Sequence, residues 1–134
     1  MLVVDAANVI GSRPTGWWRD RPGAARAFVG QLRAAAGRGV LPLPVVVVLE
    51  GEARAGAAET DADGVRVVHA AGSGDDALLA ELARPGGDPG VTVVTADRAL
   101  GDRARHAGAE TVGPSWLYRR LGPSHPGGEN AVGT

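Results

Sequence analysis

The chain has 134 residues, a formal net charge of -1 and no cysteine. This length fits one domain with its own core, and the lack of cysteine excludes disulfides, thiolate zinc sites and cysteine nucleophiles. The near-neutral charge gives no overall basic signature of nucleic-acid binding, and the 3 histidines are too scattered to predict a zinc site. No apolar run is as long as a membrane span and no signal peptide is recognisable, so we expect a cytoplasmic protein without membrane contact.

Short apolar runs alternate with stretches of helical periodicity along the chain. Strands are expected near residues 2–5, 41–49, 65–69, 91–95 and 110–112. Helices are expected near 22–38, 75–82, 97–107 and 114–121, with a weaker one at 52–61 and loops at 8–21 and 85–90. Strands that alternate with helices predict a parallel sheet covered on both faces. Residues 1–121 are expected to form the domain, and the Gly- and Pro-containing residues 122–134 to form a disordered tail.

Three of the predicted strands end in a carboxylate. Asp5 ends the first strand, Glu50 ends the second, and Asp97 follows the strand at 91–95. The carboxyl ends of parallel strands lie along one edge of the sheet, where ligands bind, so neighbouring strands would bring these acids together. Carboxylates that converge repel one another, and a hard cation with oxygen ligands, Mg²⁺ or Mn²⁺, would relieve the repulsion. Glu52 competes with Glu50 for the second position.

Other polar residues lie near these strand ends in the sequence. Asn8 follows Asp5 by three residues and could either stabilise a turn or orient a metal-bound water. Asp75 and Asp76 begin a predicted helix after Ser73, and one acid there is enough to cap the helix and favour its dipole. The other acid is free for the site, and Asp75 is the favoured one.

The predicted loop at 8–21 holds two adjacent tryptophans in a chain with few aromatic residues. Trp17 and Trp18 could cover the core, or they could stack on unpaired bases of RNA. In the second interpretation, Arg13 and Arg19 would contact backbone phosphates, since guanidinium groups bind phosphate in a bidentate way. Arg98, beside Asp97, is a further candidate for phosphate.

Three sequence motifs together resemble the PIN-like nucleases, especially the NYN group. Val-Val-Asp-Ala-Ala-Asn-Val-Ile at 3–10 resembles the first strand of that group, which typically ends Asp-x-x-Asn followed by a hydrophobic residue. Gly-Asp-Asp-Ala-Leu at 74–78 resembles the acid that opens a middle helix. Val-Val-Thr-Ala-Asp-Arg-Ala-Leu at 93–100 is similar to the motif Thr-x-Asp-x-x-Leu before the last strand.

This resemblance, which spans about residues 2–121, implies a Rossmann-like three-layer α/β/α sandwich with a central, mostly parallel sheet of four to five strands. It implies a metal-dependent ribonuclease that hydrolyses RNA with unpaired segments and uses Mg²⁺ or Mn²⁺. The oligomeric state stays open, with a homodimer as one alternative. By the resemblance, the acidic core would be Asp5, Asp75 or Asp76, and Asp97, with Asn8 in support and Glu50 at the second-strand position.

Two other functions remain open at this point. A phosphatase-type phosphoryl-transfer enzyme would use Asp5 as its nucleophile, although the Asp-x-x-Asn order differs from the Asp-x-Asp of the haloacid-dehalogenase type. A non-catalytic module with the same fold would bind RNA or a partner without metal. A dinucleotide-binding enzyme is disfavoured, because no Gly-x-Gly-x-x-Gly follows the first strand.

Overall fold

The computed structural model describes residues 1–83 and 90–122 of the chain. The predicted loop at 85–90 and the predicted tail at 122–134 therefore lie outside the described residues, apart from Gly90 and Gly122. Within the described residues, no helix is both long enough and apolar enough to cross a membrane.

Six strands form one sheet in the order β3-β4-β2-β1-β5-β6. All neighbouring pairs are parallel except β3 and β4, which are antiparallel. The chain adds β2 and β4 on one side of β1 and then crosses to add β5 and β6 on the other side, so the topological switch point lies between β1 and β5. The strands are β1 (Leu2–Asp5), β2 (Val45–Leu49), β3 (Asp61–Ala62), β4 (Val65–His69), β5 (Thr92–Val94) and β6 (Glu110–Val112).

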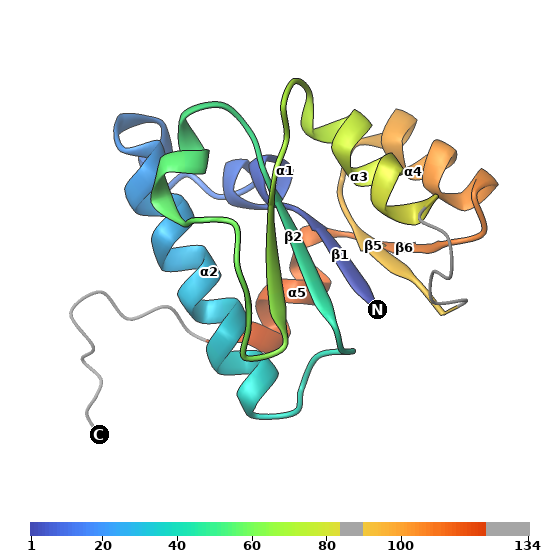
Figure 1. Ribbon diagram of the computed structural model, residues 1–134, viewed down its shortest axis with the longest axis horizontal. Helices are drawn as coiled ribbons and strands as arrows, with labels where there is room; N and C mark the ends of the chain where they lie inside the picture. The colour runs from blue at the N-terminus through green and yellow to red at the C-terminus, as the bar shows by residue number, and fades with distance from the viewer. Residues whose placement is uncertain (84–89, 123–134) are drawn as a thin grey trace.

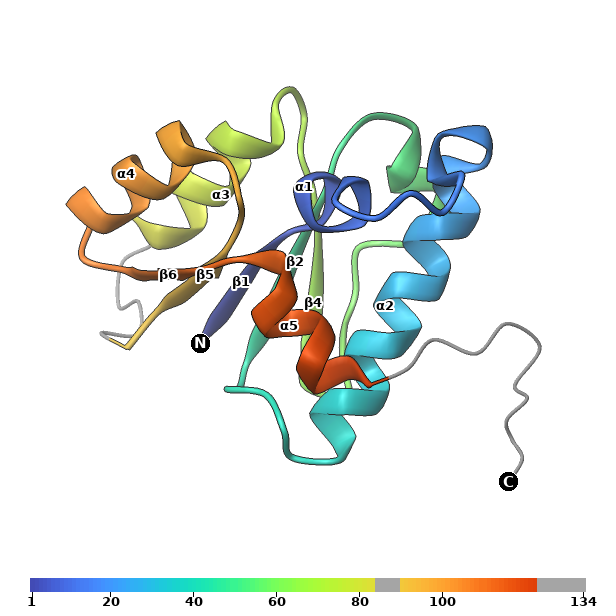
Figure 2. The same ribbon diagram turned by 180° about the vertical axis from the view of Figure 1, so that it is seen from behind.

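Helices cover both faces of this sheet (Figures 1 and 2). One apolar core unites α1, α2 and α5 with one face, and a second core unites α3 and α4 with the other. The predicted three-layer α/β/α architecture is thereby confirmed. The helices are α1 (Ala6–Gly11), α2 (Arg21–Gly37), α3 (Gly74–Leu82), α4 (Arg98–His106) and α5 (Pro114–Leu121), with short 3₁₀ turns at η1 (Trp17–Arg19) and η2 (Gly51–Gly56).

Strand β1 lies at the centre and is buried on both of its faces. Leu2 and Val4 pack in the core beneath α2 and α5, whereas Val3 packs in the core beneath α3 and α4. Alternating residues of a strand point to opposite faces, so an unbroken apolar run is what a doubly covered strand requires. The site below is built on this rigid central strand.

Four details differ from the sequence-based expectations. The predicted loop at 8–21 overlaps α1, which begins directly after β1, and it also holds η1. The second strand begins at Val45 rather than residue 41, since prolines 42 and 44 lack the N–H that a strand ladder needs. The expected helix at 52–61 is a 3₁₀ turn that ends at Gly56, and β3 is a sixth strand of two exposed residues with no apolar pattern to reveal it.

Candidate active site at the carboxyl edge of the sheet

Asp5 lies at the carboxyl end of the central strand and beside the switch point. Its side chain is only 8% exposed. It caps α1 by accepting a hydrogen bond of 3.4 Å from the backbone N–H of Asn8. The hydroxyl of Thr95 donates a second hydrogen bond of 3.1 Å to Oδ2 of Asp5. A buried carboxylate is thus held in place by two donors from two elements.

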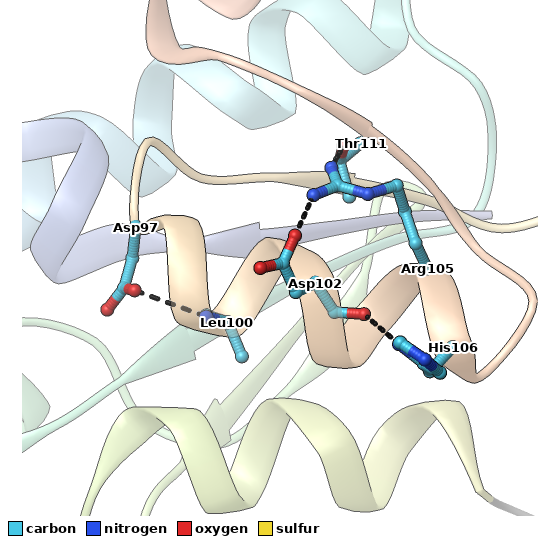
Figure 3. A network of polar contacts seen from close by, with 6 residues as sticks. All are labelled: Asp97, Leu100, Asp102, Arg105, His106 and Thr111. Atoms are coloured by element: carbon cyan, nitrogen blue, oxygen red, sulfur yellow. Dashed lines mark hydrogen bonds and ion pairs between the residues drawn. The ribbon is translucent and has the colours of Figure 1, made fainter.

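Thr95 also connects Asp5 to the end of β5. Its Oγ1 accepts a hydrogen bond of 3.1 Å from the backbone N–H of Asp97, and Asp97 caps α4 by accepting 3.1 Å from the N–H of Leu100 (Figure 3). Asn8 closes the network, because its Oδ1 accepts a hydrogen bond of 2.6 Å from the N–H of Ala96. Two predicted acids and the predicted amide therefore belong to one polar network.

Thr95 was not among the residues expected at the site. The signal that could have found it is the strand register: Val4 pairs with Val94, so the next residues, Asp5 and Thr95, lie at the same level. Thr95 is 7% exposed, and among the described residues Thr95 and Asp5 are the two buried polar residues.

Glu50 and Asp75 approach from the other side of β1. The carboxylate of Glu50 accepts a hydrogen bond from the backbone N–H of Gly74, which begins α3. Asp75 is half-buried and interacts electrostatically with Asp5, Glu50 and Asp97. Asp76 is exposed, and its backbone N–H donates 3.2 Å to the capping Ser73. Asp75 is therefore the acid of this pair that faces the site.

The four carboxylates of Asp5, Glu50, Asp75 and Asp97 are called the acidic edge below. The pKa of Asp5 is raised from 3.8 to about 6: burial is the largest cause, the hydrogen bonds from Thr95 and Asn8 lower it, and the charges of Asp75 and Glu50 raise it. Burial also raises the pKa of Asp75, with contributions from Asp97 and Glu50, while Arg103 lowers it. Both shifts come mainly from burial, and the charges of the neighbouring acids add to them.

The donor chemistry of the acidic edge fits a hard cation, because carboxylate oxygens are the ligands that Mg²⁺ and Mn²⁺ prefer. A bound cation would also relieve the electrostatic repulsion among these acids. Across residues 1–83 and 90–122, however, no three acids or histidines lie close enough together to hold an ion as they stand. A metal site therefore stays a prediction that requires side-chain movement.

The residues expected to contact RNA do not all lie on one surface. Trp18 is 52% exposed and stands edge-on to Trp17, with ring centroids 6.1 Å apart. The Arg19 guanidinium lies 5.8 Å from the Trp18 ring. Arg13 instead lies 3.8 Å from the ring of Tyr118 in α5 and lines a cavity with it. Arg98 is exposed at the start of α4.

Two further acids lie apart from the acidic edge. Glu52, the competitor of Glu50, is exposed in η2. Asp102 forms an ion pair with Arg105, which also donates 2.6 Å to Thr111, and the carbonyl of Asp102 bonds His106 (Figure 3). These contacts tie α4 to β6 and give Asp102 a structural role.

A cavity of about 310 Å³ lies beside the acidic edge. It is lined by small apolar residues of α1, α2 and η2, together with Trp17, Arg21 and Glu50. We call it the Trp17 cavity. The cavity was not predicted from the sequence, because part of its wall comes from α1 and η1, where a loop was expected.

No protein-family model and no curated protein sequence matches the chain. Its structure is similar to the crystal structure of a mutant of Rae1 (YacP) from Bacillus subtilis, with a TM-score of 0.61. The two chains share 21% identity, and the match covers 90% of this chain and 72% of that one. At this identity the similarity shows the fold alone, which is a Rossmann-like α/β/α sandwich.

Proposed function

We propose that the protein is a metal-dependent ribonuclease that hydrolyses RNA phosphodiester bonds at the acidic edge. The observation that carries the proposal is the position of Asp5: a buried carboxylate at the switch point of a mostly parallel sheet, with two more acids, Asp75 and Glu50, in electrostatic reach. In open α/β sheets, ligands bind at this point. The resemblance of the three sequence motifs to PIN-like nucleases, and the PIN-type fold, support the same reaction class.

In this proposal, Asp5, Asp75 and Asp97 would hold Mg²⁺ or Mn²⁺, with Glu50 at the margin of the set. The ion would supply a water of lowered pKa and positive charge beside the scissile phosphate. Asn8 has a fixed orientation, because its carbonyl oxygen is bonded to Ala96, and its NH₂ group is the end that can donate to a phosphate oxygen.

Arginines would position the RNA backbone. Arg98 begins α4 directly after Asp97, and Arg103, on the same helix, already interacts with Asp75. Guanidinium groups offer paired donors that match phosphate oxygens. Trp18, exposed in η1, would stack on an unpaired base, so the substrate class is RNA with single-stranded segments.

The test is cleavage of a labelled, mostly single-stranded RNA in the presence of Mn²⁺. Wild-type protein is expected to cut it, EDTA is expected to stop the reaction, and Asp5→Asn and Asp97→Asn are each expected to reduce the rate at least about 100-fold. Asp61→Asn, an exposed acid in edge strand β3, is the matched control and should retain full activity. Metal-independent cleavage, or full activity in Asp5→Asn, would overturn the proposal.

A second candidate is an RNA-binding module without catalysis. One observation favours it: the acids of the described chain are not gathered closely enough to hold an ion as they stand. RNA binding without cleavage, unaffected by Asp5→Asn, would establish this alternative. The phosphatase-type alternative is disfavoured, because the Asp-x-x-Asn order that begins at Asp5 differs from the Asp-x-Asp of the haloacid-dehalogenase type.

A further inference from the structure

The Trp17 cavity opens at the same edge of the sheet as the four acids. Ala6 and Ala7 in its wall directly follow Asp5, and Glu50 belongs both to the cavity and to the acidic edge. Its volume of about 310 Å³ is at the lower end of the range for small-molecule pockets, about 300–1,000 Å³. A nucleotide strand whose phosphate lay at the acids would therefore pass beside this cavity.

The walls of the cavity suit a flat ring. The indole of Trp17 forms one side, and Ala6, Ile10 and Ala53 contribute apolar surface. The Arg21 guanidinium lies 4.9 Å from the centre of the Trp17 ring. Unpaired bases stack on aromatic rings, and each base stacked in this way contributes about 1–3 kcal/mol.

Two charged side chains line the cavity, and they differ in hydrogen-bonding character. Arg21 carries only donors, and within the described chain its guanidinium forms no ion pair with a carboxylate. Glu50 carries only acceptors: Oε2 is bonded to the N–H of Gly74, and no hydrogen bond to Oε1 is formed within the same residues. The cavity thus offers a donor fork and an unused acceptor.

Guanine is the base that matches this pair. It presents two acceptors, O6 and N7, to an arginine fork, which is the commonest specific base contact of arginine. Its Watson–Crick edge presents two donors, N1–H and N2–H, from which a carboxylate can accept hydrogen bonds. Adenine would place its N1 acceptor against the carboxylate, and uracil offers it a single N–H.

We propose that the Trp17 cavity binds a guanine base of the RNA strand whose phosphate lies at the acidic edge. The inference rests on the proposed ribonuclease function and adds to it a preference for RNA with an unpaired guanine next to the scissile bond. Trp17 holds the ring by stacking, and Arg21 and Glu50 select guanine by hydrogen bonds to its edges.

The first test measures binding of the four nucleoside monophosphates by calorimetry, in EDTA, so that no metal links phosphate to the acids. Guanosine monophosphate is expected to bind roughly tenfold more tightly than the adenosine, cytidine and uridine monophosphates. Trp17→Ala should weaken the binding of all four nucleotides. Arg21→Ala should abolish the preference, and Arg21→Lys, which keeps the charge but loses the fork, should weaken it. Equal binding of all four nucleotides would overturn the proposal.

The chain offers a matched control for these variants. Trp116 and Arg120 of α5 form a second tryptophan–arginine pair with the same spacing of four residues, 3.8 Å from ring centre to guanidinium, outside the cavity. Arg120→Ala should therefore leave the guanine preference intact. If Arg120→Ala and Arg21→Ala reduce binding equally, the effect does not come from the cavity and the proposal is overturned.

A second test separates this proposal from the ribonuclease proposal. RNA 12-mers of uridine with one central guanosine, adenosine or cytidine are incubated with Mn²⁺, and the cut positions are mapped. Cuts beside the guanosine, shifted to random positions by Arg21→Ala, support both proposals. Cuts without regard to guanosine overturn the guanine subsite alone, whereas selective binding of guanosine monophosphate without any cleavage supports the subsite and overturns the ribonuclease.

Discussion

The hydroxyl of Thr95 donates a hydrogen bond of 3.1 Å to Oδ2 of Asp5, and so joins the end of β5 to the end of β1 across the switch point of the sheet. Oγ1 of Thr95 also accepts a hydrogen bond of 3.1 Å from the backbone N–H of Asp97. One threonine therefore fixes the positions of two of the four carboxylates, and the relationship follows from a strand register that pairs Val4 with Val94.

Thr95→Val tests this link, because valine keeps the shape of threonine and removes the hydroxyl. The buried Asp5 carboxylate would lose one of its two donors, so the free energy of unfolding is expected to fall by about 1–3 kcal/mol. The pKa of Asp5 should rise further, since the bond from Thr95 lowers it. Urea denaturation measures the first effect, and NMR titration of the side-chain carboxyl carbon measures the second.

Thr92→Val, at a half-buried position of the same strand, is the control for the change of residue type. Thr92→Val should change the free energy of unfolding and the pKa of Asp5 much less than Thr95→Val does. Equal losses of stability in the two variants would mean that the bond between Thr95 and Asp5 adds nothing specific to the fold.

Asp5 is expected to make the protein less stable at neutral pH than in mild acid. Its pKa of about 6 in the folded state exceeds the ordinary 3.8, so the folded state binds this proton more tightly than the unfolded state does. Above pH 6 the group is charged in both states and opposes folding by roughly 3 kcal/mol. The penalty shrinks as the pH falls through 6 and is absent below 3.8.

Asp5→Asn removes the charge and measures this penalty. Its free energy of unfolding should exceed that of the wild type by up to about 3 kcal/mol at neutral pH, less whatever the altered hydrogen bond to Thr95 costs, and by little near pH 4. Denaturation curves at several pH values between these limits provide the measurement. A gain that stays the same at all pH values would show that the charge of Asp5 is not its cause.

The fold could largely be predicted from the sequence, because its elements carry strong local patterns. β2 is an apolar run whose residues are all buried, and the spacing of Phe28, Leu32 and Ala36 identifies the buried face of α2. α1 was missed because a helix of 6 residues is too short for periodicity to show. β3 was missed because both of its residues are exposed.

The site could be predicted only in part, because it depends on how the elements pack. Parallel neighbouring strands are enough to bring Asp5 and Asp97 to one edge. The roles of Asp75 and Asp76 depend on the orientation of α3, which a run of two acids leaves undecided. The Trp17 cavity depends on how α1, η1, α2 and η2 pack beside one another, and no motif in the sequence indicates that packing.

Mg²⁺ or Mn²⁺ is expected to raise the melting temperature of the wild-type protein. An ion that binds only the folded state stabilises it by about 2.7 kcal/mol at a concentration 100 times its Kd, and here it would also relieve the repulsion among the acids. Differential scanning fluorimetry with and without metal measures the shift. Asp97→Asn should reduce the shift and Asp61→Asn should retain it, whereas no shift at saturating metal would count against a metal site.

Gly74→Ala is expected to displace Glu50 at little cost to the fold. A Cβ at Gly74 would lie 2.8 Å from Oε2 of Glu50, which is the far end of a flexible side chain that can move away. The lost hydrogen bond costs about 1 kcal/mol, and the better helix propensity of alanine offsets a similar amount. The free energy of unfolding should therefore change little, while the preference for guanosine monophosphate is lost with the position of Glu50.

Gly56→Ala provides the contrast, because there the new Cβ would lie 2.1 Å from the backbone oxygen of Pro22. Backbone has no rotamer to change, so η2 must move away from α2 and the free energy of unfolding should fall by about 2–4 kcal/mol. Urea denaturation compares the two variants. If Gly74→Ala proves as destabilising as Gly56→Ala, Glu50 is held by more than its hydrogen bond to Gly74. The position of Glu50 beside the cavity would then serve the packing of α3 and not the selection of a ligand.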